Sequence, residues 1–320
     1  MNHSNYLNTM DSRAVTEILK VAHEIETSGF SKVTRILQDP FVLGTMFHNA
    51  ESREQHICEL TGARLGVPVV DLSWRDVESK ETSALLDELL MAESTVDLLL
   101  TAFNSKETFG EGRKLTTKFT GASKGPIVSL HDDIYNWQTA LSHVLGFQNR
   151  IGNLSGKRVV VSWGFGSNFA SPAVAHGLIT TSALAGADVR VVEPPDFPTL
   201  NRVRKEAAES SRSVEVTSDY RNAFSDADAV YVLNWFRLND FNHPERNVNH
   251  VSKYNDWYLT KNLLPESCIL STDPSIQSGL SIEPELLQDP RCINSSWLSR
   301  RVQTLAATIH YALHYECSIT

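Results

Sequence analysis

Cysteine is scarce in this chain of 320 residues, which contains Cys58, Cys268, Cys292 and Cys317 and no others. No two of them form a Cys-x-x-Cys pair, so the sequence predicts neither a zinc site nor a disulfide framework. The histidines also lack the spacing typical of metal ligands. We therefore expect no metal and no bound cofactor.

Blocks of Lys or Arg are missing as well, and the formal net charge is −9 at pH 7. Without such blocks the chain cannot neutralise a phosphate backbone, which argues against a nucleic-acid partner. Apolar runs such as Leu98 to Leu100 are far too short to cross a bilayer. Met1 to Asn5 lack the cationic region and apolar core of a signal peptide. These absences predict a soluble cytoplasmic protein that binds small molecules, with no nucleic acid and no membrane as partner.

The chain has enough length and apolar content for two domains that share a cleft, since 41% of its residues are hydrophobic. Helical and extended patterns alternate along both halves, which is typical of α/β folds with parallel sheets. The polar segment Gly152 to Gly156 predicts a hinge. We expect two doubly wound domains, residues 1–150 and 151–298, and a terminal helix in residues 299–320 that packs back on the first domain.

Apolar residues at helical spacing predict helices, and short apolar runs between turn residues predict strands. The predicted helices are residues 13–28, 51–65, 82–92, 134–150, 172–185, 199–210 and 299–315. The predicted strands are residues 41–47, 67–72, 96–103, 126–130, 158–162, 188–192, 214–217, 229–233 and 268–271.

The segment from Lys157 to Pro195 predicts a strand, a Gly-containing loop, a helix and a second strand. Such units bind ligands where the strand ends and the helix begins. Trp163 and Asn168 lie in that loop, and exposed polar loop residues often contact ligands. The loop also imitates a dinucleotide fingerprint, with Glu193 at the end of the next strand. However, Phe169 stands at the third glycine position and would block pyrophosphate, which argues against a nicotinamide-dependent oxidoreductase.

Several stretches, in the expected order, resemble the aspartate/ornithine carbamoyltransferase family. Phe47 to Gly66 stands where the family has its phosphate-binding Ser-Thr-Arg-Thr-Arg turn and helix. Tyr135 to Leu141 stands at the His-Pro-x-Gln-Ala-Leu segment, and Ser271 to Pro274 at the His-Cys-Leu-Pro loop. Val161-Ser162-Trp163 followed by Ser171 to Gly177, together with Lys253 to Trp257, is most similar to the acetylornithine-type and uncharacterised branch.

The resemblance implies a homotrimer of two-domain, transcarbamylase-like subunits, with a loop containing Lys80 reaching the neighbouring subunit. It implies a donor site in the first domain with Arg53, Gln138 and Tyr135 in catalytic positions and Ser52 and Glu51 beside them. The resemblance and the loop positions together also imply residues that bind an amino-acid-type acceptor, which lie after residue 150. These are Trp163, Asn168, Asp273 and Arg300.

The donor motif departs from the family pattern. Glu51 and Glu54 replace hydroxyl residues, Ala102 replaces an arginine, and Tyr135 replaces a histidine. Carboxylates in the first helical turn suit the helix dipole but repel an incoming phosphate. The carbamoyl-phosphate motif is therefore expected to be degraded.

Each candidate also has an ordinary structural role. Arg53 could equally pair with a neighbouring acid, and Gln138 could be a polar face residue of its helix; Tyr135 and Trp137 suit packing better than catalysis. Asp273 suits a turn before Pro274. At least one of Arg300 and Arg301 is expected to be a solvated or interdomain charge.

Two functions remain open from these residues. The first is a divergent enzyme that transfers a carbamoyl-type group to the amino group of an amino-acid-like substrate. The second is a transcarbamylase-fold protein that has lost carbamoyl-phosphate chemistry and is non-catalytic or binds another ligand.

Overall fold

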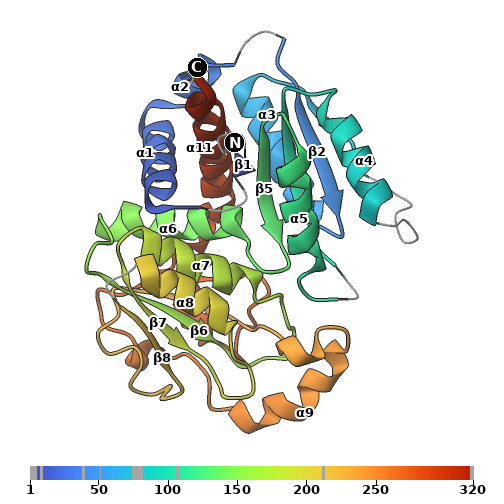
Figure 1. Ribbon diagram of the computed structural model, residues 1–320. Coiled ribbons are helices and arrows are strands. Elements are labelled where there is room, and N and C mark those ends of the chain that lie inside the picture. The colour runs from blue at the N-terminus through green and yellow to red at the C-terminus, as the bar shows by residue number, and fades with distance from the viewer. Residues whose placement is uncertain are drawn as a thin grey trace. The chain divides into compact units, whose positions relative to one another are not determined.

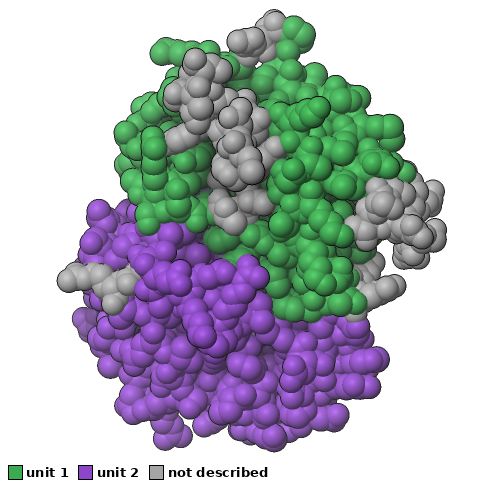
Figure 2. All heavy atoms as spheres, in the orientation of Figure 1, with its two compact units in different colours: residues 1–138, 298–320 green, residues 139–297 purple. Residues whose placement is uncertain are grey.

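The computed structural model describes residues 6–7, 10–37, 40–50, 52–73, 82–105, 108–210 and 213–317. The chain forms two compact units, which Figure 2 colours separately. Unit 1 contains residues up to 138 and from 298 onward, and unit 2 contains residues 139–297. The boundaries expected from the sequence were 150/151 and 298/299. Within the described ranges, no helix is long and apolar enough to cross a membrane.

Unit 1 contains a five-stranded parallel sheet in the order β1-β5-β4-β2-β3. Figure 1 shows α5 crossing in front of this sheet. The strands are β1 (Tyr6–Leu7), β2 (Leu43–His48), β3 (Val69–Asp71), β4 (Leu98–Phe103) and β5 (Ile127–Asp132). The helices are α1 (Ser12–Ser28), α2 (Ser31–Thr34), α3 (Ser52–Leu65), α4 (Thr82–Glu93), α5 (Glu111–Ala122) and most of α11 (Trp297–Cys317).

Unit 2 contains a second five-stranded parallel sheet in the order β10-β9-β6-β7-β8, with α7 and α8 in front of it in Figure 1. The strands are β6 (Arg158–Trp163), β7 (Asp188–Val192), β8 (Val214–Thr217), β9 (Ala229–Leu233) and β10 (Ile269–Thr272). The longer helices are α6 (Trp137–Ile151), which begins in unit 1, α7 (Ala173–Leu184) and α8 (Asn201–Ser210). The short helices are α9 (Val248–Val251), α10 (Pro284–Gln288) and 3-10 turns at Leu238–Asp240, Pro244–Asn247, Ser252–Tyr254, Lys261–Leu263 and Asn294–Ser296.

The predicted fold class is confirmed, because both sheets are parallel and helices connect their strands. All seven predicted helices and all nine predicted strands are present, with boundaries shifted by a few residues. Parallel sheets are covered on both faces, so their strands form apolar runs. The interior strands β4 and β9 follow this rule, since each has a neighbour on both sides and every residue in them is buried.

Helix α5 was missed by the sequence analysis. Its threonines and glycines have low helix propensity, and three of the threonine hydroxyls bond back to the carbonyl four residues earlier. Leu115 and Phe119 nevertheless lie one turn apart on the buried face and pack into the core of unit 1. Tertiary packing therefore outweighs propensity in this segment.

Candidate functional site

In unit 1, strands β5, β4 and β2 are neighbours and end at the same side of the sheet. We call their carboxyl ends, with the residues that follow each strand, the unit 1 edge. Ligands of open parallel sheets bind at such edges. Here Asn49 adopts a left-handed conformation with φ of 52°, and its amide donates to the carbonyl oxygen of Asn104 at 3.0 Å. The loops after β2 and β4 are thereby tied together.

Two buried aspartates organise the loop after β5. Asp132 accepts the backbone N–H groups of Ile134 and Tyr135 on one carboxylate oxygen. Asp133 accepts the N–H groups of Gly110 and Gly112 at the start of α5, at 3.0 and 2.7 Å. Burial raises the pKa of Asp133 to about 6, although these backbone donors act in the opposite direction. The two carboxylates therefore hold the start of α5 against the end of β5.

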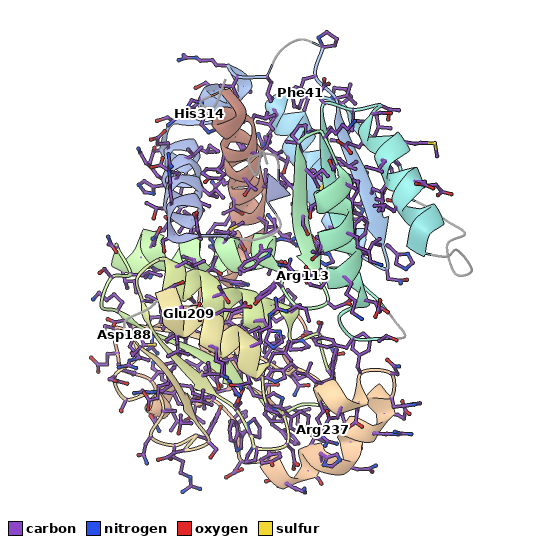
Figure 3. All side chains as sticks on the ribbon, viewed as in Figure 1. Phe41, Arg113, Asp188, Glu209, Arg237 and His314 are labelled. Atoms are coloured by element: carbon purple, nitrogen blue, oxygen red, sulfur yellow. The ribbon has the colours of Figure 1, made fainter. Side chains whose placement is uncertain are left out.

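Arg113 is a cation at the unit 1 edge. It lies in the first turn of α5, where Figure 3 labels it. Its guanidinium donates to Asp132 at 2.9 Å and lies 5.5 Å from the centre of the Tyr135 ring. The side chain of Asp132 is fully buried, whereas that of Arg113 keeps 12% of its surface exposed. The pairing with Asp132 offsets part of its positive charge but also fixes the plane of the guanidinium, a group that binds carboxylates and phosphates through several donors.

Arg53 is a second cation of the unit 1 edge. It lies in the first turn of α3, directly after β2, and is half-buried. Arg53 and Arg113 therefore begin helices that follow the neighbouring strands β2 and β4. Helix N-termini attract anions through their free N–H groups and dipole. Ala102, at the position of the family arginine, is fully buried inside β4.

Glu54 corrects one expectation about charge at this edge. Its side chain is 5% exposed and forms an ion pair with Arg301 of α11, which is 1% exposed. The carboxylate is thus turned into the core of unit 1 and neutralised, so it does not repel an incoming phosphate. Glu51 lies outside the described residues.

Gln138 belongs to the same buried group. Its amide nitrogen donates to the carbonyl oxygen of Arg301 at 2.6 Å, and its amide oxygen accepts from the Arg301 guanidinium at 2.6 Å. This geometry does not support the predicted contact of Gln138 with a carbamoyl group. Of the two roles expected at the start of α11, a solvated charge is ruled out for Arg300 and Arg301, because both are buried; an interdomain charge stays a prediction.

The other residues predicted for the donor site are Tyr135 and Ser52, with Lys80 in the loop predicted to reach the neighbouring subunit. Tyr135 is 1% exposed and stacks on Trp137 with ring centres 4.4 Å apart, which is the packing role considered from the sequence. The side chain of Ser52 and the whole of Lys80 lie outside the described residues.

In unit 2, the loop between β6 and α7 lies against the loop that follows β10. The exposed Asn168 donates to the carbonyl oxygen of Ser275 at 3.3 Å, and the N–H of Ser167 donates to the side-chain oxygen of Gln277 at 2.6 Å. Asp273 is half-buried and accepts the N–H of Ser275 at 2.8 Å. The predicted acceptor residues Asn168 and Asp273 therefore lie on two loops that touch each other.

Trp163 occupies a different position from the one expected. It is fully buried, and its indole N–H donates to the carbonyl oxygen of Trp235 at 3.0 Å. Phe197, Tyr254 and Trp257 surround its ring. Since the only polar atom of the Trp163 side chain is bonded internally, the residue supports the loop from beneath and direct contact with a ligand is not supported.

Glu193 is equally unsuited to a dinucleotide. It is 6% exposed, accepts the N–H and hydroxyl of Thr199 at 2.7 and 2.8 Å, and pairs with Arg204. A ribose-binding carboxylate would have to be open to the ligand.

Two residues that follow the carboxyl ends of strands, Arg113 in unit 1 and Asn234 in unit 2, were not predicted from the sequence. Arg113 was overlooked because α5 was not predicted. Asn234 directly follows β9, donates to the carbonyl oxygen of Gly164 at 2.6 Å, and keeps a buried side-chain oxygen without a partner in the described part of the chain. A polar residue at the end of a predicted apolar strand was the available signal for Asn234.

Comparisons with known proteins agree with this architecture. The family model "Aspartate/ornithine carbamoyltransferase, Asp/Orn binding domain" matches residues 168–270. An ornithine carbamoyltransferase of Rhodococcus jostii (strain RHA1) is 25% identical over 285 residues, which cover 87% of this chain and 85% of the relative. An N-acetylornithine carbamoyltransferase of Xanthomonas campestris is 26% identical over 184 residues, which cover 55% of this chain and 54% of the relative.

Solved structures show the same fold. A crystal structure of acetylornithine transcarbamylase complexed with acetylcitrulline has a TM-score of 0.84 and 21% sequence identity, and the match covers 96% of this chain and 98% of that one. The chain is thus similar in sequence to carbamoyltransferases along most of its length, and it shares the fold of acetylornithine transcarbamylase.

Proposed function

We propose that the protein transfers a carbamoyl-type group from an acyl phosphate to the amino group of an amino-acid-like substrate. The observation that carries the proposal is the pair Arg53 and Arg113. Both begin helices that follow neighbouring parallel strands, so two guanidinium groups belong to one edge of the unit 1 sheet. Two cations at helix N-termini suit a dianionic phosphate.

The chemistry requires little acid–base machinery. The amine nitrogen attacks the carbonyl carbon, a C–N bond forms, the C–O bond to phosphate breaks, and the amine proton leaves with phosphate or solvent. Holding the reactants in line and stabilising negative charge accounts for most of such catalysis. In unit 1, Arg53 and Arg113 serve the phosphate; in unit 2, Asn168 and Asp273 serve the amino acid.

Phosphate release tests the proposal. We expect the purified full chain to release phosphate from carbamoyl phosphate when ornithine or N-acetylornithine is added. Replacing Arg53 with Met is expected to lower kcat/KM by about 10–100-fold, since a hydrogen bond to a charged group contributes about 1.5–3 kcal/mol. Arg64→Met is the matched control, because Arg64 is exposed at the other end of α3. Equal activity of both variants would remove Arg53 from the donor site.

The second candidate is a transcarbamylase fold that has lost this chemistry, and buried Ala102 in place of the family arginine favours it. Two results together would support this second function over the first. No diamino acid or acylated diamino acid would cause phosphate release, and the protein would not bind carbamoyl phosphate.

The resemblance to carbamoyltransferases also leads us to propose a homotrimer in which the loop containing Lys80 reaches the neighbouring subunit. Light scattering coupled to gel filtration is expected to give about three times the 35.7 kDa chain mass. A monomeric mass at micromolar concentration would contradict the trimer.

A further inference from the structure

Unit 2 has a hollow of about 520 Å³ whose lining does not include Asn168 or Asp273. Its size lies within the range of about 300–1,000 Å³ that is typical of small-molecule sites. It is bordered by the turn after β8, by the segment after α9, by one residue of the loop after β6 and by two residues of the loop after β10. The lining residues are Phe165, Tyr220, Arg221, Asn255, Asp256, Tyr258, Thr260, Leu263, Gly279 and Leu280.

The side chain of Tyr220 provides the strongest sign of a ligand. It is 6% exposed and packs against Trp257 and Phe224. Its hydroxyl has no hydrogen-bond partner in the described residues. Burial raises the pKa of Tyr220 far above its ordinary range, with Asp256 acting in the same direction, so the hydroxyl keeps its proton. A buried donor without an acceptor costs free energy unless a ligand supplies one.

Charges of both signs line the hollow. Arg221 and Asp256 both line the hollow and are both exposed. Further negative charge lies near Tyr258, from Glu283 and Glu285. The hollow therefore offers a guanidinium and a phenol that can bind a carboxylate, and an acidic side that can bind an ammonium group.

The rest of the wall is apolar. Phe165, Leu263 and Leu280 line the hollow together with the Tyr258 ring, and Leu280 is 44% exposed. Exposed leucine next to charges of both signs suits a ligand with a zwitterionic head and an apolar side chain. We propose that this hollow binds a free α-amino acid with an apolar side chain, its carboxylate held by Tyr220 and Arg221 and its ammonium by Asp256.

Occupancy of the hollow would act on the acceptor loop. The N–H of Phe165 donates to the carbonyl oxygen of Trp257 at 3.0 Å, and its carbonyl oxygen accepts from the Ser281 hydroxyl. Phe165 stands three residues before Asn168 in the same loop. An amino acid packed on Phe165 therefore stabilises one conformation of that loop. The binding itself does not depend on carbamoyl transfer.

Calorimetric titration of the full chain with L-phenylalanine and L-leucine tests the site. We expect saturable binding below roughly 10 mM. Neither 2-phenylethylamine, which lacks the carboxylate, nor 3-phenylpropionate, which lacks the ammonium group, should bind comparably. Tyr220→Phe and Arg221→Met should each raise the Kd about tenfold or more. The melting temperature of unliganded Tyr220→Phe should be unchanged or higher, because the lost hydroxyl has no partner within the described residues.

Two further variants locate the binding. Arg246→Met removes another exposed arginine of unit 2 and should leave the Kd unchanged. Asn168→Ala alters the acceptor loop, which is coupled to the hollow through Phe165, and should change the Kd much less than Tyr220→Phe does. The proposal is overturned if the unaltered chain binds neither amino acid. It is overturned equally if Asn168→Ala abolishes binding while Tyr220→Phe does not, since the amino acid would then occupy the acceptor loop.

Discussion

Replacing Glu54 with Ala is expected to lower the free energy of unfolding by about 3–5 kcal/mol, because it leaves a buried guanidinium without its carboxylate. Arg301 is 1% exposed, and its guanidinium also donates to the amide oxygen of Gln138. That amide is neutral and cannot replace the lost negative charge. Urea unfolding followed by circular dichroism at one fixed protein concentration measures the change.

Glu59→Gln is the matched control for this substitution. Glu59 lies on the same helix but is exposed, so its neutralisation should change stability by less than about 0.5 kcal/mol. Replacing both Glu54 and Arg301 by apolar residues of similar size should recover much of the loss, because no unpaired charge is then buried. A loss of less than about 1 kcal/mol in Glu54→Ala would show that the pair is open to water.

The same pair determines a pH dependence. Burial alone would raise the pKa of the Glu54 carboxyl, but the positive charges of Arg301, His131 and Arg53 outweigh it, and the pKa lies below its ordinary value. The pKa of a Glu carboxyl in the unfolded chain is about 4.3. A carboxyl whose pKa is lower in the folded protein stabilises the fold at pH values above about 4.3, and this stabilisation is lost as the pH falls through the folded-state pKa. Below about pH 4.3, the free energy of unfolding should therefore fall more steeply with decreasing pH for the native chain than for the Glu54→Gln variant, which has no carboxyl to protonate at this position.

Replacing Gly112 with Ala is expected to destabilise unit 1 by about 2–3 kcal/mol or more and to abolish the donor geometry. A Cβ atom at this position would lie 2.1 Å from the carbonyl oxygen of Phe103 and 2.9 Å from the Asp133 carboxylate. A backbone oxygen cannot move aside as a flexible side chain can, so α5 must shift away from β4. That shift displaces Arg113, the next residue.

Gly121→Ala, at the other end of α5, should have the opposite effect. No atom lies within 4 Å of a Cβ built there, so the substitution should gain up to about 1 kcal/mol of helix propensity. Thermal unfolding and phosphate release compare the two variants. A Gly112→Ala protein with native stability and activity would show that α5 does not lie close against β4.

The candidate site was only partly predictable from the residues. Arg53, Asn168 and Asp273 follow strands, and the alternation of apolar runs with polar residues is enough to place them at sheet edges. Arg113 could not be found because its helix is rich in threonine and glycine, and packing rather than propensity forms it. Trp163 follows the same loop pattern as Asn168, yet its ring is buried among aromatic side chains.

The residue pattern was enough to predict the order and type of most of the longer elements, with α5 as the exception, together with both parallel sheets and the resemblance to carbamoyltransferases. These depend on local periodicity and on strands long enough to bury an apolar run. Only the tertiary structure decided which polar groups remain for a ligand. Glu54 and Gln138 meet Arg301 across 247 and 163 residues of chain. No local pattern encodes such distant pairing, because it arises when separate elements pack and each buried charge must find a partner.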